Sequence, residues 1–287
     1  MLLSIIVPVY NDLENLEKCI GSMVGRNHGD TSFEFIIVDN DPGASIGMSP
    51  GSDCLVKVVK CEKEGAYAAR NKGAQEARGE YLAFVDADCI FDDNWLVNAK
   101  NIIGENPDID LVAGDVVLFA ECHMKPNAFE IYDMILGINQ RAYAKKGKSV
   151  TANLIIKKSV FADLRGFNDS RFSGSDHEFC ERADKQGFRF GFFPCLIVYH
   201  PARNCMPLIA NKAKRRVGGR IGVTKLKDAK AILITLLPPV VRFYKILFSK
   251  GFSWHDKKKA IRILFVVNKI QVVELYKILL LNKKKVR

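Results

Sequence analysis

The chain has 287 residues, 48% of them hydrophobic and 26% charged, so it can bury a substantial core and is not of the disordered type. Its eight cysteines form no C-x-x-C pair and no zinc spacing, which favours buried thiols in a reducing cytosol over a disulfide framework or a zinc module. The start, MLLSIIVPVYND, has no basic region and too short an apolar run for a signal peptide, so we expect it to form the first strand.

The net charge of +11 is concentrated at one end of the chain. Residues 201–287 carry 22 lysines and arginines against 3 acidic residues, whereas residues 1–200 carry 21 against 29. The sequence therefore predicts a mildly acidic domain followed by a basic tail. Such an asymmetry indicates an anionic surface as the partner of the tail.

Strands and helices are expected to alternate along the first 110 residues. The expected strands are 4–10, 33–38, 55–59 and 81–85, and the expected helices begin at Leu13, Ala66 and Trp95. This alternation predicts an α/β fold with a mostly parallel sheet between layers of helices. The elements expected further along are strands at 111–119, 151–156, 189–193 and 196–199 and helices at 128–143, 159–164 and from about 175 to Gly187.

Two acidic residues follow the apolar run 81–85 at once. Asp86 and Asp88 are separated only by Ala87, which places both at the carboxyl edge of the sheet, where open α/β folds bind ligands. Carboxylates this close repel each other unless they share a cation, and Mg²⁺ or Mn²⁺ prefers such oxygen ligands. The alternative is that an aspartate here only caps the following helix.

Four blocks of sequence resemble, in this order, the family 2 glycosyltransferases of GT-A fold: SIIVPVYND, EFIIVDND, AYAARNKGAQEARGEYLAFVDADC and SGSDHEFCERADKQGF. The resemblance covers roughly residues 1 to 220. It implies an inverting single displacement that moves a sugar from a nucleotide-diphosphate sugar, with a UDP-sugar favoured, to a hydroxyl acceptor. It also implies that the donor lies across the carboxyl edge of the sheet.

The resemblance assigns a set of residues to the nucleotide. These are Pro8, Val9, Tyr10, Asp39, Arg70 and Asp86. The first three are expected to wall the base, Asp39 to accept a hydrogen bond from a base N–H, and Asp86 to hold the ribose hydroxyls. Arg70 is expected to face the nucleotide or its phosphates, because its guanidinium matches phosphate geometry. The alternatives are a turn-forming Asp39 and a solvated Arg70.

The resemblance also assigns the metal and the general base. Asp88 corresponds to the metal ligand, and His200 stands where many members place a further ligand, although a lone histidine is often structural. Asp176 corresponds to the general base, which removes the proton of the acceptor hydroxyl. Many relatives have Glu-Asp where this chain has Ser175-Asp176, and Glu178 is placed to assist; Asp176 is also a candidate helix N-cap.

Several further residues are candidates for closing over the diphosphate. They are Ser173, Gly174, Lys214, Arg215, Arg216 and Arg220.

Residues 1–220 are expected to form the catalytic domain and residues 221–287 a basic, amphipathic, helical tail. The uncharged run 231–241 is too short to span a bilayer, which asks for about 20 residues. The longer stretch 261–281 is interrupted by charges and flanked by lysines at 257–259 and 283–285. This pattern predicts interfacial helices on an anionic leaflet, peripheral at the cytoplasmic face of the cell membrane, near a lipid-linked or cell-surface glycan acceptor. The alternative is an ordinary helical lid.

Other classes of function fit the sequence less well. A sugar-nucleotide-binding or nucleotidyltransferase protein of similar fold is the nearest alternative, but the chain has no glycine-rich loop after its first strand and no G-x-G-x-x-G motif. Nucleic-acid binding through the tail is disfavoured, because its basic residues lack an interleaved aromatic platform. We therefore expect a metal-dependent glycosyltransferase of polysaccharide biosynthesis, with Mn²⁺ or Mg²⁺ as cofactor and no nucleic-acid partner.

Overall fold

The computed structural model describes residues 2–23, 32–43, 55–121, 125–171, 173–222 and 225–281. The chain divides into two compact units. The first comprises Met1–Val117, Gln140–Ser170 and Ser175–His200, and the second comprises Leu118–Asn139, Arg171–Gly174 and Pro201–Arg287. The boundary predicted at residue 220 falls inside the second unit, which takes in two earlier segments of the chain as well as the basic tail.

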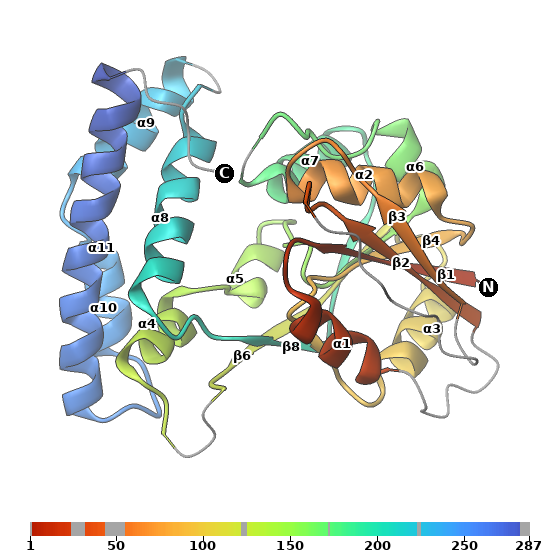
Figure 1. Cartoon of the computed structure of the whole chain (residues 1–287), viewed down its shortest axis with the longest axis horizontal. Helices are drawn as coiled ribbons and strands as arrows, with labels where there is room; N and C mark the ends of the chain where they lie inside the picture. Colours follow the sequence, from red (N-terminus) through yellow and green to blue (C-terminus); the bar gives the residue numbers. More distant parts are fainter. Residues whose placement is uncertain are drawn as a thin grey trace. The chain divides into compact units, whose positions relative to one another are not determined.

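The first unit is built on a mixed sheet with the strand order β3-β2-β1-β4-β7-β6-β8-β5 (Figure 1). The strands are β1 (Leu2–Val9), β2 (Ser32–Asp39), β3 (Leu55–Lys60), β4 (Tyr81–Phe84), β5 (Ile90–Phe91), β6 (Leu111–Phe119), β7 (Leu154–Lys157) and β8 (Phe190–Pro201). Parallel pairing joins β3, β2, β1 and β4, whereas β4–β7, β6–β7 and β5–β8 are antiparallel. The predicted α/β class is confirmed, and parallel pairing joins the four strands β3, β2, β1 and β4.

Helices cover both faces of this sheet (Figure 1). They are α1 (Leu13–Gly21), α2 (Ala66–Glu76), α3 (Trp95–Glu105), α6 (Lys158–Asp163) and α7 (Ser175–Lys185), with the short α5 (Gln140–Ala144) between β6 and β7 in the chain. On the face of α2, α6 and α7, aromatic rings pack between helices and strands, with Phe84, Phe161, Phe167 and Phe179 in mutual contact. On the face of α1 and α3, Phe91 packs edge-on against Trp95.

Gly73 lets α2 lie close to the parallel strands. A Cβ at this position would come within 2.5 Å of a methyl carbon of Ile6 on β1 and within 2.9 Å of one of Val38 on β2. A side chain larger than hydrogen is therefore excluded unless α2 moves away from the sheet. This contact holds the second half of α2 against β1 and β2.

Replacing Gly73 with alanine is expected to lower the free energy of unfolding by about 1–3 kcal/mol, because the added methyl group overpacks the interface between α2 and the sheet. Gly104 in α3 is the matched control, since a Cβ there meets nothing within 4 Å. Gly104→Ala is expected to raise the free energy of unfolding by about 0.5–1 kcal/mol through helix propensity. Urea denaturation of both variants measures the difference, and changes of the same sign would contradict the packing argument.

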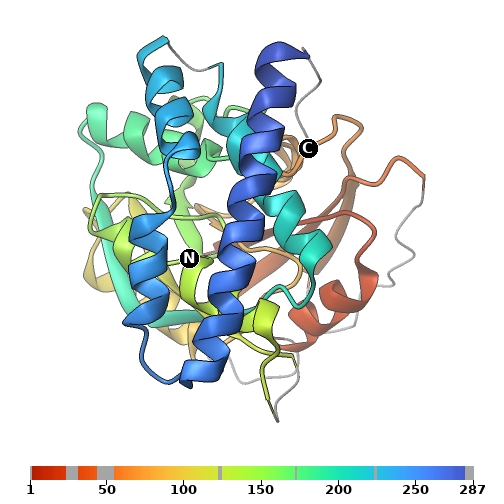
Figure 2. The same ribbon diagram turned by 90° about the vertical axis from the view of Figure 1, so that its left-hand side faces the viewer.

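The second unit consists mainly of helices. They are α4 (Ala128–Leu136), α8 (Met206–Arg220), α9 (Lys225–Leu236), α10 (Val240–Leu247) and α11 (Trp254–Leu280). The long α11 packs against the other four, and Figure 2 shows it in dark blue beside α10. A capping box between Asn127 and Glu130 starts α4, which ends at Gly137. The single helix expected at 128–143 is therefore two helices, α4 and α5.

The helices of the basic tail bury one set of apolar side chains and expose another. Ile246, Ala260 and Leu264 are completely buried between α4, α8, α10 and α11. Large apolar side chains at the surface are Leu233, Ile234, Leu236, Leu237, Val240, Val241, Tyr244, Phe248, Trp254, Phe265, Val266, Val273, Tyr276, Leu279, Leu280 and Leu281. Within the described ranges, none of the helices is both long enough and apolar enough to pass through a membrane.

Candidate active site

Asp86, Asp88 and His200 come together at the carboxyl edge of the sheet. The two aspartates follow β4, and His200 lies near the end of β8, beside the Ile90–Tyr199 pair of β5 and β8. Each of the three side chains offers one ligand atom, and these atoms lie within 4.8 Å of one another. His200 Nε2 is 3.6 Å from Asp88 Oδ2.

This cluster suits a divalent cation. His200 is almost fully buried, whereas the side chains of Asp86 and Asp88 each keep 31% of their surface accessible. Two carboxylate oxygens and one imidazole nitrogen form a donor set that fits Mn²⁺ well and Mg²⁺ through its oxygens. The structure thus brings Asp86, which the resemblance assigns to the ribose, together with Asp88 and His200, which it assigns to the metal.

Arg70 reaches the same cluster from α2. It is buried, and its Nη2 forms an ion pair with Asp86 Oδ1. Its guanidinium carbon lies 5.4 Å from the centre of the Tyr67 ring, one turn earlier on the helix. The alternative of a solvated Arg70 is therefore wrong. Its Nε has no hydrogen-bond partner among the described residues, which leaves a buried donor available beside the acidic pair.

Asp39 lies at the end of β2, directly opposite Val9 of β1. Its buried carboxylate accepts a hydrogen bond from the Asp41 backbone N–H at 2.9 Å and pairs with Lys60 Nζ at 2.8 Å. Asp39 therefore forms the turn contact considered as an alternative, together with an ion pair that the sequence did not indicate. Since two carboxylate oxygens offer about four acceptor positions, these bonds leave acceptor capacity. Tyr10, which follows Val9 in the chain, is 64% exposed.

The neighbouring Asn40 holds the loop that leads into α2. Its side-chain amide donates to the carbonyl oxygens of Cys61 at 2.9 Å and Lys63 at 2.8 Å. Its side-chain oxygen accepts from the Gly65 backbone N–H at 2.8 Å. Gly65 has φ of +117°, a conformation that favours glycine, and α2 begins at the next residue.

Asp176 lies in the first turn of α7 and is 8% exposed. Its Oδ1 accepts a hydrogen bond from the His177 backbone N–H at 2.8 Å. This bond is to the next residue and differs from the bond to the second or third following residue that characterises an N-cap. Ser175 beside it is completely buried, and its hydroxyl has no partner within the described part of the chain.

Tyr67 connects Asp176 with Arg70. Burial is the main factor that raises the pKa of Tyr67, and the Asp176 carboxylate adds to the increase. The phenol is therefore neutral at physiological pH and lies near Asp176 while its ring packs against Arg70. Tyr67 was not predicted as a site residue, although its spacing of three from Arg70 places both on one face of α2.

Glu178 is held by an ion pair within its own helix. Its Oε1 accepts from Arg182 Nε at 2.8 Å, and Arg182 Nη2 donates to the Gly166 carbonyl oxygen at 2.7 Å. The Arg182 guanidinium also packs on the Phe179 ring, with 5.2 Å between its central carbon and the ring centre. Glu178 thus has a structural role in fixing α7 to the preceding loop, and its assistance to Asp176 stays a prediction.

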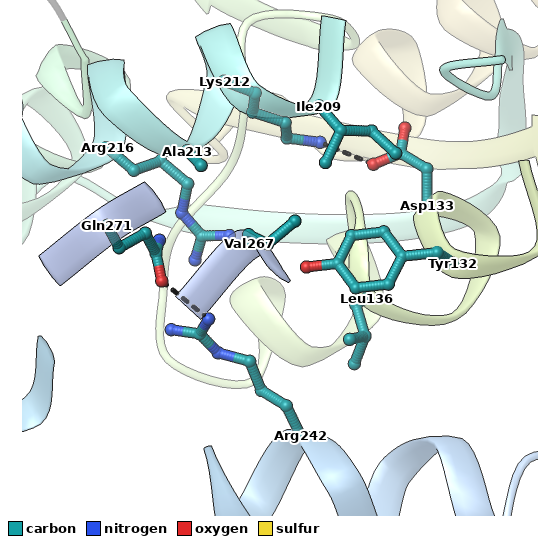
Figure 3. Close-up of a pocket in the computed structure, with 10 residues that line it drawn as sticks. All are labelled: Tyr132, Asp133, Leu136, Ile209, Lys212, Ala213, Arg216, Arg242, Val267 and Gln271. Carbon is teal, nitrogen blue, oxygen red and sulfur yellow. Dashed lines mark hydrogen bonds and ion pairs between the residues drawn. The ribbon is translucent and has the colours of Figure 1, made fainter. Parts of the chain in front are cut away.

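The candidates for closing over the diphosphate all belong to the second unit. Within that unit, Ser173 lies against the end of α8, because a Cβ at Gly219 would approach the Ser173 carbonyl oxygen to 2.7 Å. Arg216 lines a cavity in the same unit (Figure 3).

Solved structures define the class to which this fold belongs. A mannosyltransferase from Pyrobaculum calidifontis, PcManGT, in complex with GDP-Man and Mn²⁺, matches with a TM-score of 0.64 at 16% identity, over 98% of this chain and 88% of that one. The S. aureus TarS 1–349 complex with UDP-GlcNAc matches with a TM-score of 0.51 at 16% identity, over 97% and 90% of the two chains. The fold is that of GT-A glycosyltransferases, as predicted.

Sequence comparisons identify the family. The profile described as Glycosyl transferase family 2 matches residues 4–161, more than half of the chain. Glycosyltransferase AglE of Haloferax volcanii is 32% identical over 235 residues, which are 78% of this chain and 74% of that protein. The pre-mycofactocin glycosyltransferase of Mycobacterium tuberculosis is 25% identical over 73% of this chain and 45% of its own length. This protein belongs to the family 2 glycosyltransferases.

Proposed function

We propose that this glycosyltransferase moves a sugar from a nucleotide-diphosphate sugar to a hydroxyl of a lipid-linked or cell-surface glycan, with inversion at the anomeric carbon. The observation that carries the proposal is the cluster of Asp86, Asp88 and His200 with the Arg70 guanidinium beside it. Structural relatives with GDP-Man and Mn²⁺ or with UDP-GlcNAc support a metal-bound nucleotide sugar as the donor. A UDP-sugar is the favoured donor class.

We assign the donor to residues at or just beyond the ends of three strands of the first unit, β1, β2 and β4, and to Arg70 of α2. Val9 and its neighbours Pro8 and Tyr10, at the end of β1, wall the base, and Asp39 accepts from a base N–H. Asp86 holds the ribose hydroxyls. Arg70, whose Nε is a buried donor without a partner among the described residues, faces the phosphates.

The chemical step is a single displacement. The acceptor oxygen forms a bond to the anomeric carbon as the bond to the donor phosphate breaks, and its proton passes to Asp176. The electron pair of the broken bond leaves with the nucleoside diphosphate. Asp88 and His200 would hold a divalent cation, which would neutralise the charge that develops on this leaving group.

A donor screen tests the proposal. The full-length protein is heated with Mn²⁺ and, in turn, UDP- and GDP-sugars, because a ligand at 100 times its Kd stabilises the native state by about 2.7 kcal/mol. Sugars that raise the melting temperature are then assayed for release of the nucleoside diphosphate with and without the metal. The proposal fails if no nucleotide sugar stabilises the protein or is turned over.

We further propose that the second unit attaches the enzyme peripherally to the anionic, cytoplasmic face of the cell membrane. In this unit α9, α10 and α11 expose large apolar side chains within a segment rich in lysine and arginine. Apolar contact with the interface and attraction to anionic lipids act together in such helices. The basic flank at 257–259 lies at the start of α11, whereas the flank at 283–285 is outside the described residues.

The protein is expected to float with anionic liposomes at low salt and to lose binding as salt screens the attraction. Replacing the exposed Lys258 and Lys259 with glutamine should weaken binding, since each basic residue near the surface contributes about 1 kcal/mol. The matched control replaces Lys145 and Lys146, which are exposed in the first unit. Full-length protein that stays in the soluble fraction at low salt would overturn the attachment.

A further inference from the structure

A cavity in the second unit lies between α4, α8, α10 and α11 (Figure 3), and its lining includes none of the residues assigned above to the base, the ribose, the metal or the general base. The side chains that matter to its chemistry are Tyr132, Asp133, Lys212, Arg216, Arg242 and Gln271. The cavity measures about 30 Å³, whereas one water needs about 10–15 Å³, so a group of a few heavy atoms fits.

The only carboxylate that lines this cavity, within the described ranges, is already paired with two cations. Asp133 pairs with Arg203 Nη1 at 2.8 Å and with Lys212 Nζ at 3.2 Å. Burial acts to raise the pKa of Asp133, but the two cations outweigh it and hold the pKa below its usual range. Asp133 therefore remains charged and has no further negative charge to offer.

Arg216 and Arg242 are left without a carboxylate at ion-pair distance in the described part of the protein. Arg242 Nη1 donates only to the neutral side-chain oxygen of Gln271, at 3.0 Å. Glu274, one turn further along α11, is buried but does not line the cavity. Lys212, Arg216 and Arg242 thus line the cavity with Asp133 as its one carboxylate among the described residues, and Asp133 is also paired with Arg203, which is not part of the lining.

Burial, and after it the neighbouring cations, lowers the pKa of Lys212 and of Arg242. Burial is the main factor that lowers the pKa of Lys212 to about 8, and Arg203 lowers it further against the opposing effect of Asp133. Burial and then Arg216 lower the pKa of Arg242. The cations repel one another, so an anion placed between them would relieve the repulsion.

Tyr132 adds a neutral donor to this group. Burial is the main cause of the raised pKa of its phenol, so the hydroxyl keeps its proton. Figure 3 shows the Tyr132 hydroxyl and the guanidinium groups of Arg216 and Arg242 directed into the same space. Guanidinium forks and hydroxyl donors around a small cavity match the oxygens of a phosphate group.

We propose that this cavity binds the phosphate group of a phosphate ester, through Arg216, Arg242 and Lys212 with the Tyr132 hydroxyl as a further donor. The phosphate can belong to a soluble ester or to a lipid. Val240, Val241 and Tyr244 are exposed on α10 around Arg242, and they offer an apolar surface to the hydrocarbon part of a lipid phosphate.

The first test uses inorganic phosphate and the full-length protein without added metal. Phosphate is expected to raise the melting temperature of the wild type and of the control Lys245→Gln, an exposed position on α10. Arg216→Gln and Arg242→Gln should each bind phosphate about tenfold or more weakly, because a charge-assisted contact is lost. Without phosphate, Arg216→Gln should melt no lower than the wild type, since it removes a mutually repelling cation. Arg242→Gln also loses the bond to Gln271, so each variant's response to phosphate is compared with its own melting temperature without phosphate. An equal phosphate response in all four proteins, or none in the wild type, overturns the proposal.

The second test separates the two sources of phosphate. Phosphatidylcholine vesicles are prepared with phosphatidic acid, whose head is a phosphate monoester, or with phosphatidylglycerol at matched surface charge. A preference for phosphatidic acid that Arg242→Gln loses and Lys245→Gln keeps supports the site and assigns it to a lipid phosphate. Equal binding to both vesicles, together with the Arg-dependent response to inorganic phosphate, supports the site and assigns it to a soluble ester.

Discussion

Replacing Asp88 with alanine is expected to reduce sugar transfer by about 100-fold or more. Asp88 and His200 are the two residues assigned to the cation, so the loss of Asp88 would leave His200 as the one assigned ligand and remove the carboxylate oxygens that the cation prefers. The charge on the departing diphosphate is then poorly neutralised. Replacing a residue that only positions a metal ligand commonly reduces metal affinity or activity by about 10–100-fold, and Asp88 is itself assigned as a ligand.

The measurement is release of nucleoside diphosphate from the preferred nucleotide sugar, with Mn²⁺ titrated for each protein. Asp93→Ala is the control, because Asp93 is an exposed acidic residue only five positions further along the chain. The control should retain the activity and metal response of the wild type. Undiminished turnover by the Asp88 variant at low Mn²⁺ would contradict the assigned metal site.

Replacing Asp176 with asparagine is expected to lower kcat by about 10²–10⁴-fold while donor binding is retained. Asparagine keeps the size of the side chain and its acceptor for the His177 N–H, but its amide cannot take the proton of the acceptor hydroxyl. The defect should therefore lie in the chemical step. Donor affinity from thermal shift and kcat from transfer assays separate the two effects.

Glu178→Gln is the matched comparison for this variant. Glu178 is bound to Arg182, so its neutralisation should weaken the anchoring of α7 and affect stability more than kcat. If Glu178→Gln lost transfer and Asp176→Asn kept it, the general base would be Glu178.

The sequence predicted the parallel half of the sheet well, because local periodicity and turn residues mark each βαβ unit. It did not reveal the antiparallel half, since pairings such as β4 with β7 depend on contacts between segments far apart in the chain. Two strands expected at 189–193 and 196–199 are the single strand β8. Pro194 and Cys195 between them are exposed, so a residue without a backbone donor is tolerated there.

The candidate metal site was predictable because the order of its motifs fixes their position at one sheet edge. The convergence of Asp86, Asp88 and His200 was expected on that ground and is seen. The partners of these motifs were not predictable: Lys60 meets Asp39 only because β2 and β3 pair in register, with Asp39 opposite Lys60. The cations that line the second-unit cavity come from two helices, Lys212 and Arg216 from α8 and Arg242 from α10, with no motif to connect them.

The three hydrogen bonds of Asn40 give the donor site an entropic advantage. They join the end of β2 to the exit of β3 and the entrance of α2, so that the residue beside Asp39 also sets the position of the helix that carries Arg70. The conformational freedom of residues 61–65 is therefore given up when the chain folds and not when the nucleotide sugar arrives. The residues assigned to the base and to the phosphates are therefore held by one ordered segment before the donor binds. The binding free energy of the donor is not reduced by the cost of ordering residues 61–65.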